Sequence, residues 1–218
     1  MSAATSTSVA DAERDGEPGG GPATCLRGRD GTVIPLDVGG WSAPADEVEH
    51  RQLADVQGPV LDIGCGPGRL VVALAERGIP ALGVDASPEA VSQAIERRAA
   101  ALVRSVFDPI PGTGRWATAL LFDGNVGIGG DPVRLLTRVG ELLARDGRAL
   151  VETGAPGTAS RSLPVRVERG EAVSDWFIWA QVGADDIADV ADAAGLRQVD
   201  LIDDDGRWFA ALEPWGPR

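Results

Sequence analysis

The feature that most constrains this chain is a glycine-rich turn between a buried strand and a helix. The segment reads VLDIGCGPGRL and places Gly64, Gly66 and Gly68 at alternate positions. Residues 69–77 then repeat apolar side chains at helical spacing and end at Gly78. Because these glycines lack side chains, the backbone can approach a ligand closely at the start of the helix. The turn therefore predicts an α/β protein with a ligand at the carboxyl ends of its strands.

Short apolar runs and amphipathic stretches alternate after this turn. The further strands are expected in PALGVD, AALVRSVF, WATALLFDG and GRALVETG. Ser87 and Asp131 each precede a proline, and this pair predicts a helix N-cap followed by proline in the first helical position. The second of these helices has an apolar face made of Leu135, Leu136, Val139 and Leu143. Such alternation predicts right-handed crossovers and a parallel sheet.

The last third of the chain changes character. RSLPVRVERG and DWFIWAQVG indicate strands, and a helix follows that stops at Gly195. The chain ends with a hairpin about Asp205 and Gly206, a common two-residue turn pair. A further helix is expected in ADEVEHRQLADVQ, before the first strand. The predicted fold is α/β and Rossmann-like, with a mostly parallel seven-stranded sheet, a C-terminal antiparallel hairpin and helices on both faces.

Two regions follow from composition along the chain. Residues 1–25 are rich in Ser, Thr, Ala and Gly, show no apolar periodicity, and are predicted to be a disordered tail. Residues 26–218 are predicted to form one domain, in keeping with a length of 218 residues. The first twenty residues lack the basic and apolar regions of a secretory signal.

Composition also limits the partners. The 20 basic and 33 acidic residues give a net charge of −13, which repels a phosphate backbone. No apolar run approaches the roughly 18 residues that a membrane span needs. We therefore expect neither a nucleic acid nor a membrane as partner. Two cysteines favour a reducing cytoplasm, and the use of Arg without any Lys is typical of a GC-rich, bacterial genome.

Three details of the glycine turn specify its ligand. Arg69 stands where a dinucleotide-binding G-x-G-x-x-G loop needs its third glycine. Asp62 precedes the first glycine, where a carboxylate would repel a pyrophosphate but attract an ammonium group. Asp85 ends the next strand, where it can accept hydrogen bonds from two ribose hydroxyls. A ligand with an amine, an adenosine ribose and no phosphate fits all three, and S-adenosylmethionine is such a ligand.

With these residues the chain resembles the class I S-adenosylmethionine-dependent methyltransferases. Their first motif, D-x-G-x-G-x-G, appears here as DIGCGPG, and the resemblance covers about residues 58–154, with the terminal hairpin matching more loosely. It implies transfer of a methyl group to O, N or C of a small-molecule acceptor, with S-adenosylhomocysteine as product. The motif specifies the cofactor and is nearly silent about the acceptor.

The resemblance also implies roles for single residues. Asp62 should contact the methionine amine, Asp85 the ribose, and Ala86 the adenine. Ser105 stands where the family often has an acid that meets the adenine amino group, and Asp108 is the alternative. The complete expected cofactor set is Asp62, Gly64, Cys65, Gly66, Gly68, Asp85, Ala86, Ser105, Val106, Phe107 and Asp123. Cys65 is interpreted as a small residue tolerated in the turn and not as a nucleophile.

Catalytic candidates follow from the end of the fourth expected strand, LLFDGNVGIGGDP. In this fold that point faces the reacting methyl group, and it presents Asp123 and Asn125. The base-directed N-P-P-aromatic motif of the family is replaced here by D-G-N-V, which disfavours methylation of a nucleic acid base. Asp123 is the preferred catalytic candidate, and His50, the single histidine, is the second. No cluster with metal-ligand spacing is seen, and the run 203–205 is interpreted as a solvated turn.

Three tryptophans bear on the acceptor. Trp41 lies before the first strand, and Trp176 and Trp179 lie between the fifth strand and the last helix, two regions that commonly cover the acceptor pocket in this family. Aromatic walls would suit an apolar or cationic small molecule, while ordinary packing explains the same residues.

Three alternatives stay open from sequence. The first is a non-catalytic S-adenosylmethionine-binding protein, the second is an NAD(P)-dependent oxidoreductase, and the third is a protein that retains the cofactor for non-methylating chemistry. The acceptor atom and the oligomeric state are not specified by the sequence.

Overall fold

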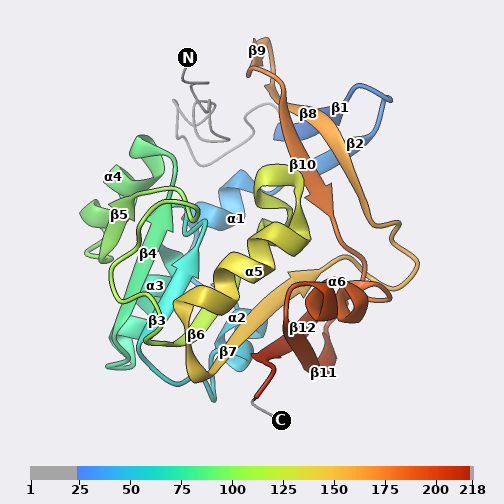
Figure 1. Ribbon diagram of the computed structural model, residues 1–218. Coiled ribbons are helices and arrows are strands. Elements are labelled where there is room, and N and C mark those ends of the chain that lie inside the picture. The colour runs from blue at the N-terminus through green and yellow to red at the C-terminus, as the bar shows by residue number, and fades with distance from the viewer. Residues whose placement is uncertain (1–23, 217–218) are drawn as a thin grey trace.

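The computed structural model of the chain describes residues 24–216, which form two β-sheets and the helices around them (Figure 1). The larger sheet has the strand order β11-β12-β7-β6-β3-β4-β5. Its strands are β3 (Val60–Ile63), β4 (Ala81–Asp85), β5 (Ala101–Val103), β6 (Trp116–Leu121), β7 (Leu143–Thr153), β11 (Leu196–Asp204) and β12 (Arg207–Pro214).

The pairing in this sheet confirms the predicted fold. Strands β5, β4, β3, β6 and β7 are parallel, and β12 runs antiparallel to both β7 and β11. The hairpin between β11 and β12 turns at Asp205 and Gly206, with φ of +56° and +81°. Two consecutive positive φ angles are what a two-residue hairpin turn with the right twist requires.

Helices cover both faces of the large sheet, as predicted. They are α1 (Val38–Ser42), α2 (Glu47–Gln52), α3 (Arg69–Glu76), α4 (Pro88–Glu96), α5 (Pro132–Leu142) and α6 (Ile187–Ala193). Alternate residues of β3 divide between the faces: Leu61 and Ile63 pack in the core with α5 and α6, and Val60 packs with α2 and α3.

The predicted N-caps are confirmed. The Ser87 hydroxyl accepts a hydrogen bond from the Ala90 N–H at 3.1 Å, and the Asp131 carboxylate accepts one from the Arg134 N–H at 2.9 Å. Each cap satisfies a backbone donor in the first turn, where no helical partner exists. They fix the starts of α4 and α5 directly after the carboxyl ends of the parallel strands.

A second, antiparallel sheet was only half expected. Its order is β10-β8-β1-β2, with β9 paired to β8, and it lies beyond the carboxyl ends of the large sheet (Figure 1, upper right). Its strands are β1 (Thr24–Gly28), β2 (Val33–Leu36), β8 (Arg161–Arg169), β9 (Ala172–Val173) and β10 (Phe177–Gln181). Strands β8 and β10 match the strand-like segments of the sequence, but β1 and β2 were not predicted. We refer to these five strands as the small sheet.

Strand β1 also bears on the predicted tail. It begins at Thr24, so the last two residues of the expected segment 1–25 are part of a strand. Residues 1–23 lie outside the described residues. The boundary of the predicted domain 26–218 stays a prediction.

Two expected elements end earlier than the sequence indicates. The third expected strand, AALVRSVF, is a strand only at Ala101–Val103, because the chain turns at Ser105, whose hydroxyl accepts a hydrogen bond from the Phe107 N–H. Leu143 was expected on the helical face, but it is extended and begins β7. It is still buried, because the first residue of the strand points into the same core.

The small sheet packs on the 3₁₀ segment η2 (Asn125–Gly130), which follows β6. A Cβ on Gly127 would come within 2.1 Å of the Ala180 carbonyl oxygen and 2.6 Å of the Trp179 ring. Glycine is therefore required where β10 crosses η2.

We expect Gly127→Ala to lower the free energy of unfolding by about 1–3 kcal/mol, since the added methyl group overpacks this contact. Urea denaturation of the purified protein measures the effect. Gly39→Ala in α1 is the matched control, because its Cβ would lie at an ordinary 3.6 Å from the nearest atom, the Asp37 Oδ1. Equal stability of the two variants would contradict close packing of β10 on η2.

Candidate functional site

The glycine turn connects β3 to α3, and its three glycines have different tasks. Gly64, Gly66 and Gly68 have φ of +74°, +51° and +83°, a region that favours glycine. A Cβ on Gly64 would lie 2.6 Å from the Asn125 amide, and one on Gly68 would lie within 2.9 Å of Ala94 and Ala99. A Cβ on Gly66 would meet nothing within 4 Å. Packing thus excludes side chains at two positions, and the third leaves open space beside the turn.

Asp85 is held against the glycine turn from the end of β4. One carboxylate oxygen accepts a hydrogen bond from the Gly66 N–H at 2.9 Å, and the other accepts one from the Ser87 N–H at 2.8 Å. Burial raises the pKa of Asp85, and the hydrogen bonds from these backbone groups oppose that shift. The carboxylate is therefore fixed at one end of the open space.

Asp62 lies inside β3 with 2% of its surface exposed. Within residues 24–216, its Oδ2 atom is buried and has no hydrogen-bond partner. Burial raises the pKa of Asp62 to about 7, and Arg69 opposes the shift while Asp123 and other carboxylates add to it. A buried carboxylate oxygen without a donor is costly. The site therefore lacks a cation that a bound ligand can provide.

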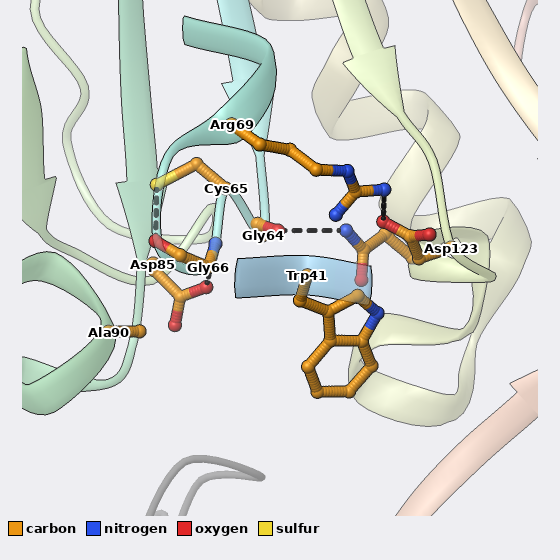
Figure 2. A pocket seen from close by; sticks show the side chains of 9 residues that line it. Trp41, Gly64, Cys65, Gly66, Arg69, Asp85, Ala90 and Asp123 are labelled. Carbon is orange, nitrogen blue, oxygen red and sulfur yellow. Dashed lines mark hydrogen bonds and ion pairs between the residues drawn. The ribbon is translucent and has the colours of Figure 1, made fainter. Parts of the chain in front are cut away.

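The Arg69 guanidinium is buried at the start of α3 and joins two carboxylates. Its Nε atom lies 3.0 and 3.1 Å from the two carboxylate oxygens of Glu49 in α2, and Nη2 also donates to Glu49. Nη2 donates to the Asp123 carboxylate at 2.6 Å (Figure 2). No hydrogen bond from Nη1 to another described residue is seen. Arg69 thus joins α2 to the end of β6 and keeps one donor for a ligand.

A second guanidinium extends this network. Arg207 donates to both carboxylate oxygens of Glu152, at 2.8 and 2.9 Å, and to Asp46 at 3.0 Å. Glu152 in turn accepts a hydrogen bond from the Asp123 N–H at 2.7 Å. Asp123 has a φ of +55°, which is uncommon for a residue with a side chain. Glu152 and Arg69 hold Asp123 in this conformation from its backbone and its side chain.

Asn125 fastens the glycine turn to η2. Its Nδ2 atom donates to the carbonyl oxygens of Ile63 and Gly64, both at 3.0 Å. Both amide hydrogens are used in this way, so the Oδ1 atom is left for another partner. The D-G-N sequence after β6 therefore holds the turn and presents polar atoms beside it.

These residues surround one pocket at the carboxyl ends of β3, β4 and β6. Figure 2 shows Asp85 and Ala90 on one side, Arg69 and Asp123 on the other, and the Trp41 indole from α1 across the opening. The lining residues are Trp41, Gly64, Cys65, Gly66, Arg69, Asp85, Ala90, Asp123 and Asn125. Six of the expected site residues thus lie in or beside one cavity: Asp62, Gly64, Cys65, Gly66, Asp85 and Asp123.

The residues expected along the adenine do not line this pocket. Ala86 is exposed, and the Ser105 hydroxyl is bonded to the Phe107 N–H. The Val106 side chain is buried in the core of the large sheet, and Phe107 lies under the Arg134 guanidinium at 4.4 Å. Their contact with adenine stays a prediction. Gly68 also lies outside the pocket lining and is needed for packing.

Three other expectations can be located. His50 is exposed and lines a separate groove with residues of α3 and the segment before α2, so it does not face Asp123. The Cys65 thiol is buried and donates to the Gly66 carbonyl oxygen, and burial raises its pKa, which disfavours a reactive thiolate. Asp108 is exposed.

The tryptophans divide between the two interpretations. Trp41 lines the pocket. Trp176 is 39% exposed and is stacked by Arg29 and Arg166, and Trp179 packs in the core of the small sheet. Only Trp41 of the three therefore contributes to the pocket lining.

Sequence reasoning missed the network around the pocket. Arg69 was noted only as a replacement for glycine, and Glu49, Glu152 and Arg207 were not singled out. One local signal was present: Asp46 and Glu49 have the spacing of a capping box, which the structure forms at the start of α2. The residues 152 and 207 carry no such signal, since each is one of many charged strand residues.

The pocket fits S-adenosylmethionine on three observations. Asp62 has an unpartnered oxygen for an ammonium group, Arg69 keeps a donor for a carboxylate, and Asp85 stands fixed beside the open space at Gly66. Within residues 24–216, no group of acidic, His and Cys side chains is arranged to hold a metal ion. In the same residues, no helix is long and apolar enough to cross a membrane.

Comparison with known proteins gives the same assignment. A methyltransferase from Bacteroides fragilis in complex with S-adenosylhomocysteine is similar in fold, with a TM-score of 0.73, 20% identity and 89% of both chains covered. The 1,6-didemethyltoxoflavin-N1-methyltransferase of Burkholderia thailandensis has a TM-score of 0.57 and 21% identity, over 80% of this chain and 78% of that one. At these identities the likeness shows the fold.

A curated relative matches over a shorter segment. This relative is a lysine N-methyltransferase of Mus musculus that is named for ATP synthase. It is 44% identical over 48 residues, which is 21% of this chain and 19% of that protein. Residues 42–201, by contrast, match the family described as methyltransferase domain. This range includes the glycine turn, the complete pocket except Trp41, and most of the large sheet. The chain therefore belongs to the methyltransferase domain family and is an S-adenosylmethionine-dependent methyltransferase.

Proposed function

We propose that this enzyme transfers a methyl group to a small-molecule acceptor that enters the pocket beside Asp123. The observation that carries this proposal is that one cavity contains both the glycine turn and the polar residues after β6, with Trp41 across its opening. An acceptor in this cavity would lie next to the cofactor. Holding two reactants together in one orientation supplies a large part of the rate of such a displacement.

The proposed roles in cofactor binding follow from the free polar atoms. Asp62 binds the ammonium group and Arg69 binds the carboxylate of the amino acid end, through Oδ2 and Nη1. Asp85 accepts hydrogen bonds from the ribose hydroxyls, and the open backbone at Gly66 lies along the same part of the ligand. Glu49 is a positioning residue, because it fixes the guanidinium of Arg69 without lining the pocket.

The cofactor supplies a methyl group activated by a positive sulfur. The chain orients the acceptor with Asp123 and Asn125 and excludes water with Trp41. Asp123 is also placed to accept a proton from the acceptor. Burial raises the pKa of Asp123, with Arg69 opposing and Glu152 adding to the shift, and a raised pKa makes the carboxylate a better base.

A small molecule is favoured over a macromolecule for two reasons. The net charge of −13 repels nucleic acids. The structurally similar toxoflavin enzyme is described as an N1-methyltransferase with its small heterocyclic substrate bound. The mouse lysine methyltransferase matches over too short a segment to transfer its acceptor. The bacterial source and the cytoplasmic setting expected from composition stay predictions.

We expect Asp85→Ala to weaken binding of S-adenosylhomocysteine at least about tenfold, because charged acceptors of ligand hydrogen bonds contribute about 1.5–3 kcal/mol. Calorimetric titration measures the dissociation constant. Asp189→Ala, on an exposed position of α6, is the control and should leave binding unchanged. Unchanged affinity in Asp85→Ala would remove Asp85 from the site.

The pKa of Asp62 predicts a pH dependence of binding. In the free protein Asp62 has a pKa of about 7, and a bound ammonium group favours its ionised form, so binding releases a proton below that pH. We expect the affinity for S-adenosylhomocysteine to rise as the pH increases from about 5.5 to about 7, by up to about tenfold per unit.

The rise should end near the pKa of the ligand's own amino group, about 8. Titrations at several pH values with the wild type and Asp62→Asn measure this dependence. The variant should bind more weakly and lose the rise below pH 7. The same slope in both proteins would show that Asp62 does not bind the ammonium group.

A further inference from the structure

The polar atoms at the acceptor side of the pocket are mainly hydrogen-bond acceptors. Asp123 gives one carboxylate oxygen to Arg69, and its other oxygen accepts nothing from residues 24–216. Asn125 uses both amide hydrogens on Ile63 and Gly64, so only its carbonyl oxygen is left. A ligand that fits these two oxygens must itself donate hydrogen bonds.

The backbone around this point offers no compensating donors. The N–H groups of Gly64 and Cys65 donate to the Val84 carbonyl oxygen, at 2.8 and 3.2 Å. The Gly66 N–H donates to Asp85, and the Asp123 N–H donates to Glu152. An oxyanion or carboxylate acceptor would therefore find few partners here, apart from the Arg69 Nη1 atom that the cofactor carboxylate claims and the Trp41 indole N–H.

The charge of the network points the same way. Four carboxylates, of Asp46, Glu49, Asp123 and Glu152, are bonded to only two guanidinium groups, of Arg69 and Arg207. The network thus has two negative charges more than positive ones. Asp62 adds a further carboxylate next to it, for which the cofactor brings the ammonium group.

Trp41 supplies a surface that suits a cation. Its indole lies across the pocket from the glycine turn, on the side of Asp123 (Figure 2). A ligand cation over the face of a tryptophan is attracted by the negative potential of the ring. A carboxylate oxygen and an indole face at one end of a cavity are together complementary to an alkylammonium group.

We propose that the methyl acceptor is a small molecule with a primary or secondary amine, held by Asp123, Asn125 and Trp41. This inference rests on the proposed function, because it specifies the acceptor of that reaction. It narrows the acceptor atom from oxygen, nitrogen or carbon to nitrogen.

The reaction is balanced without another reagent. The bound ammonium group first gives a proton to the free oxygen of Asp123. The nitrogen lone pair then forms the C–N bond while the C–S bond breaks, and its electron pair stays on sulfur. The product leaves as a methylammonium ion with S-adenosylhomocysteine, and Asp123 returns its proton to solvent. Desolvation lowers the pKa of the amine and raises that of Asp123, which brings the two values closer.

Three probes with one skeleton test this proposal: 2-phenylethylamine, 2-phenylethanol and phenylacetate. Each is titrated by ligand-observed NMR into the wild type saturated with S-adenosylhomocysteine. We expect the amine to bind at least about tenfold more tightly than the alcohol, as for a charge-assisted hydrogen bond, and phenylacetate not to bind. Alcohol or phenylacetate binding as tightly as the amine, or no binding of the amine, overturns the proposal.

Asp123→Asn should remove the preference for the amine and leave the affinity for S-adenosylhomocysteine nearly unchanged. Asparagine tolerates the positive φ at this position, so the variant is expected to fold. The control is Asp189→Asn, which makes the same change of charge on an exposed face of α6 and should keep the preference.

Two results with Asp123→Asn would overturn the proposal: an unchanged preference for the amine, or an equal loss of S-adenosylhomocysteine binding, which would make Asp123 a cofactor ligand. A wild type that does not bind S-adenosylhomocysteine would instead contradict the proposed function. The failures of the two proposals are therefore distinguishable.

Discussion

The geometry of this site depends on one buried guanidinium, that of Arg69. It lies between Glu49 of α2 and Asp123 after β6, and it begins the helix that follows the glycine turn. Removing one partner of a buried ion pair leaves an uncompensated charge and typically costs about 3–5 kcal/mol. The three segments are thus held in one arrangement. A glycine here, as in a dinucleotide-binding turn, could not make these contacts.

The excess of carboxylates gives the pocket a consistent chemistry. The network around Arg69 has a negative balance, and Asp62 adds an ionisable group that has no partner among residues 24–216. Each ligand group proposed for this end of the pocket apart from the cofactor carboxylate is positive: the ammonium group, the sulfur and the acceptor amine. Arg69 restricts the single negative ligand group to one donor. Electrostatic complementarity of this kind gives specificity more than affinity.

The large sheet could be predicted from sequence because its signals are local. Ser87, Asp131 and the pair Asp205–Gly206 each mark a helix start or turn with adjacent residues alone. The small sheet could not, since β1 is short and pairs with β8, far along the chain. The cofactor motif was equally local, whereas the ion network joins α2, α3, β7 and β12, and nothing in sequence brings Glu152 to Arg207. The adenine residues were misplaced in part because the turn at Ser105 directs Val106 into the core.

The central claim is that the pocket at the glycine turn recognises an adenosyl amino acid and not a dinucleotide. Calorimetric titration of the wild-type protein with S-adenosylhomocysteine and, separately, with NADH tests it most directly. The account predicts micromolar binding of S-adenosylhomocysteine and no detectable binding of NADH. Binding of NADH without binding of S-adenosylhomocysteine would contradict the assignment of Asp62, Arg69 and Asp85, and with it the proposed function.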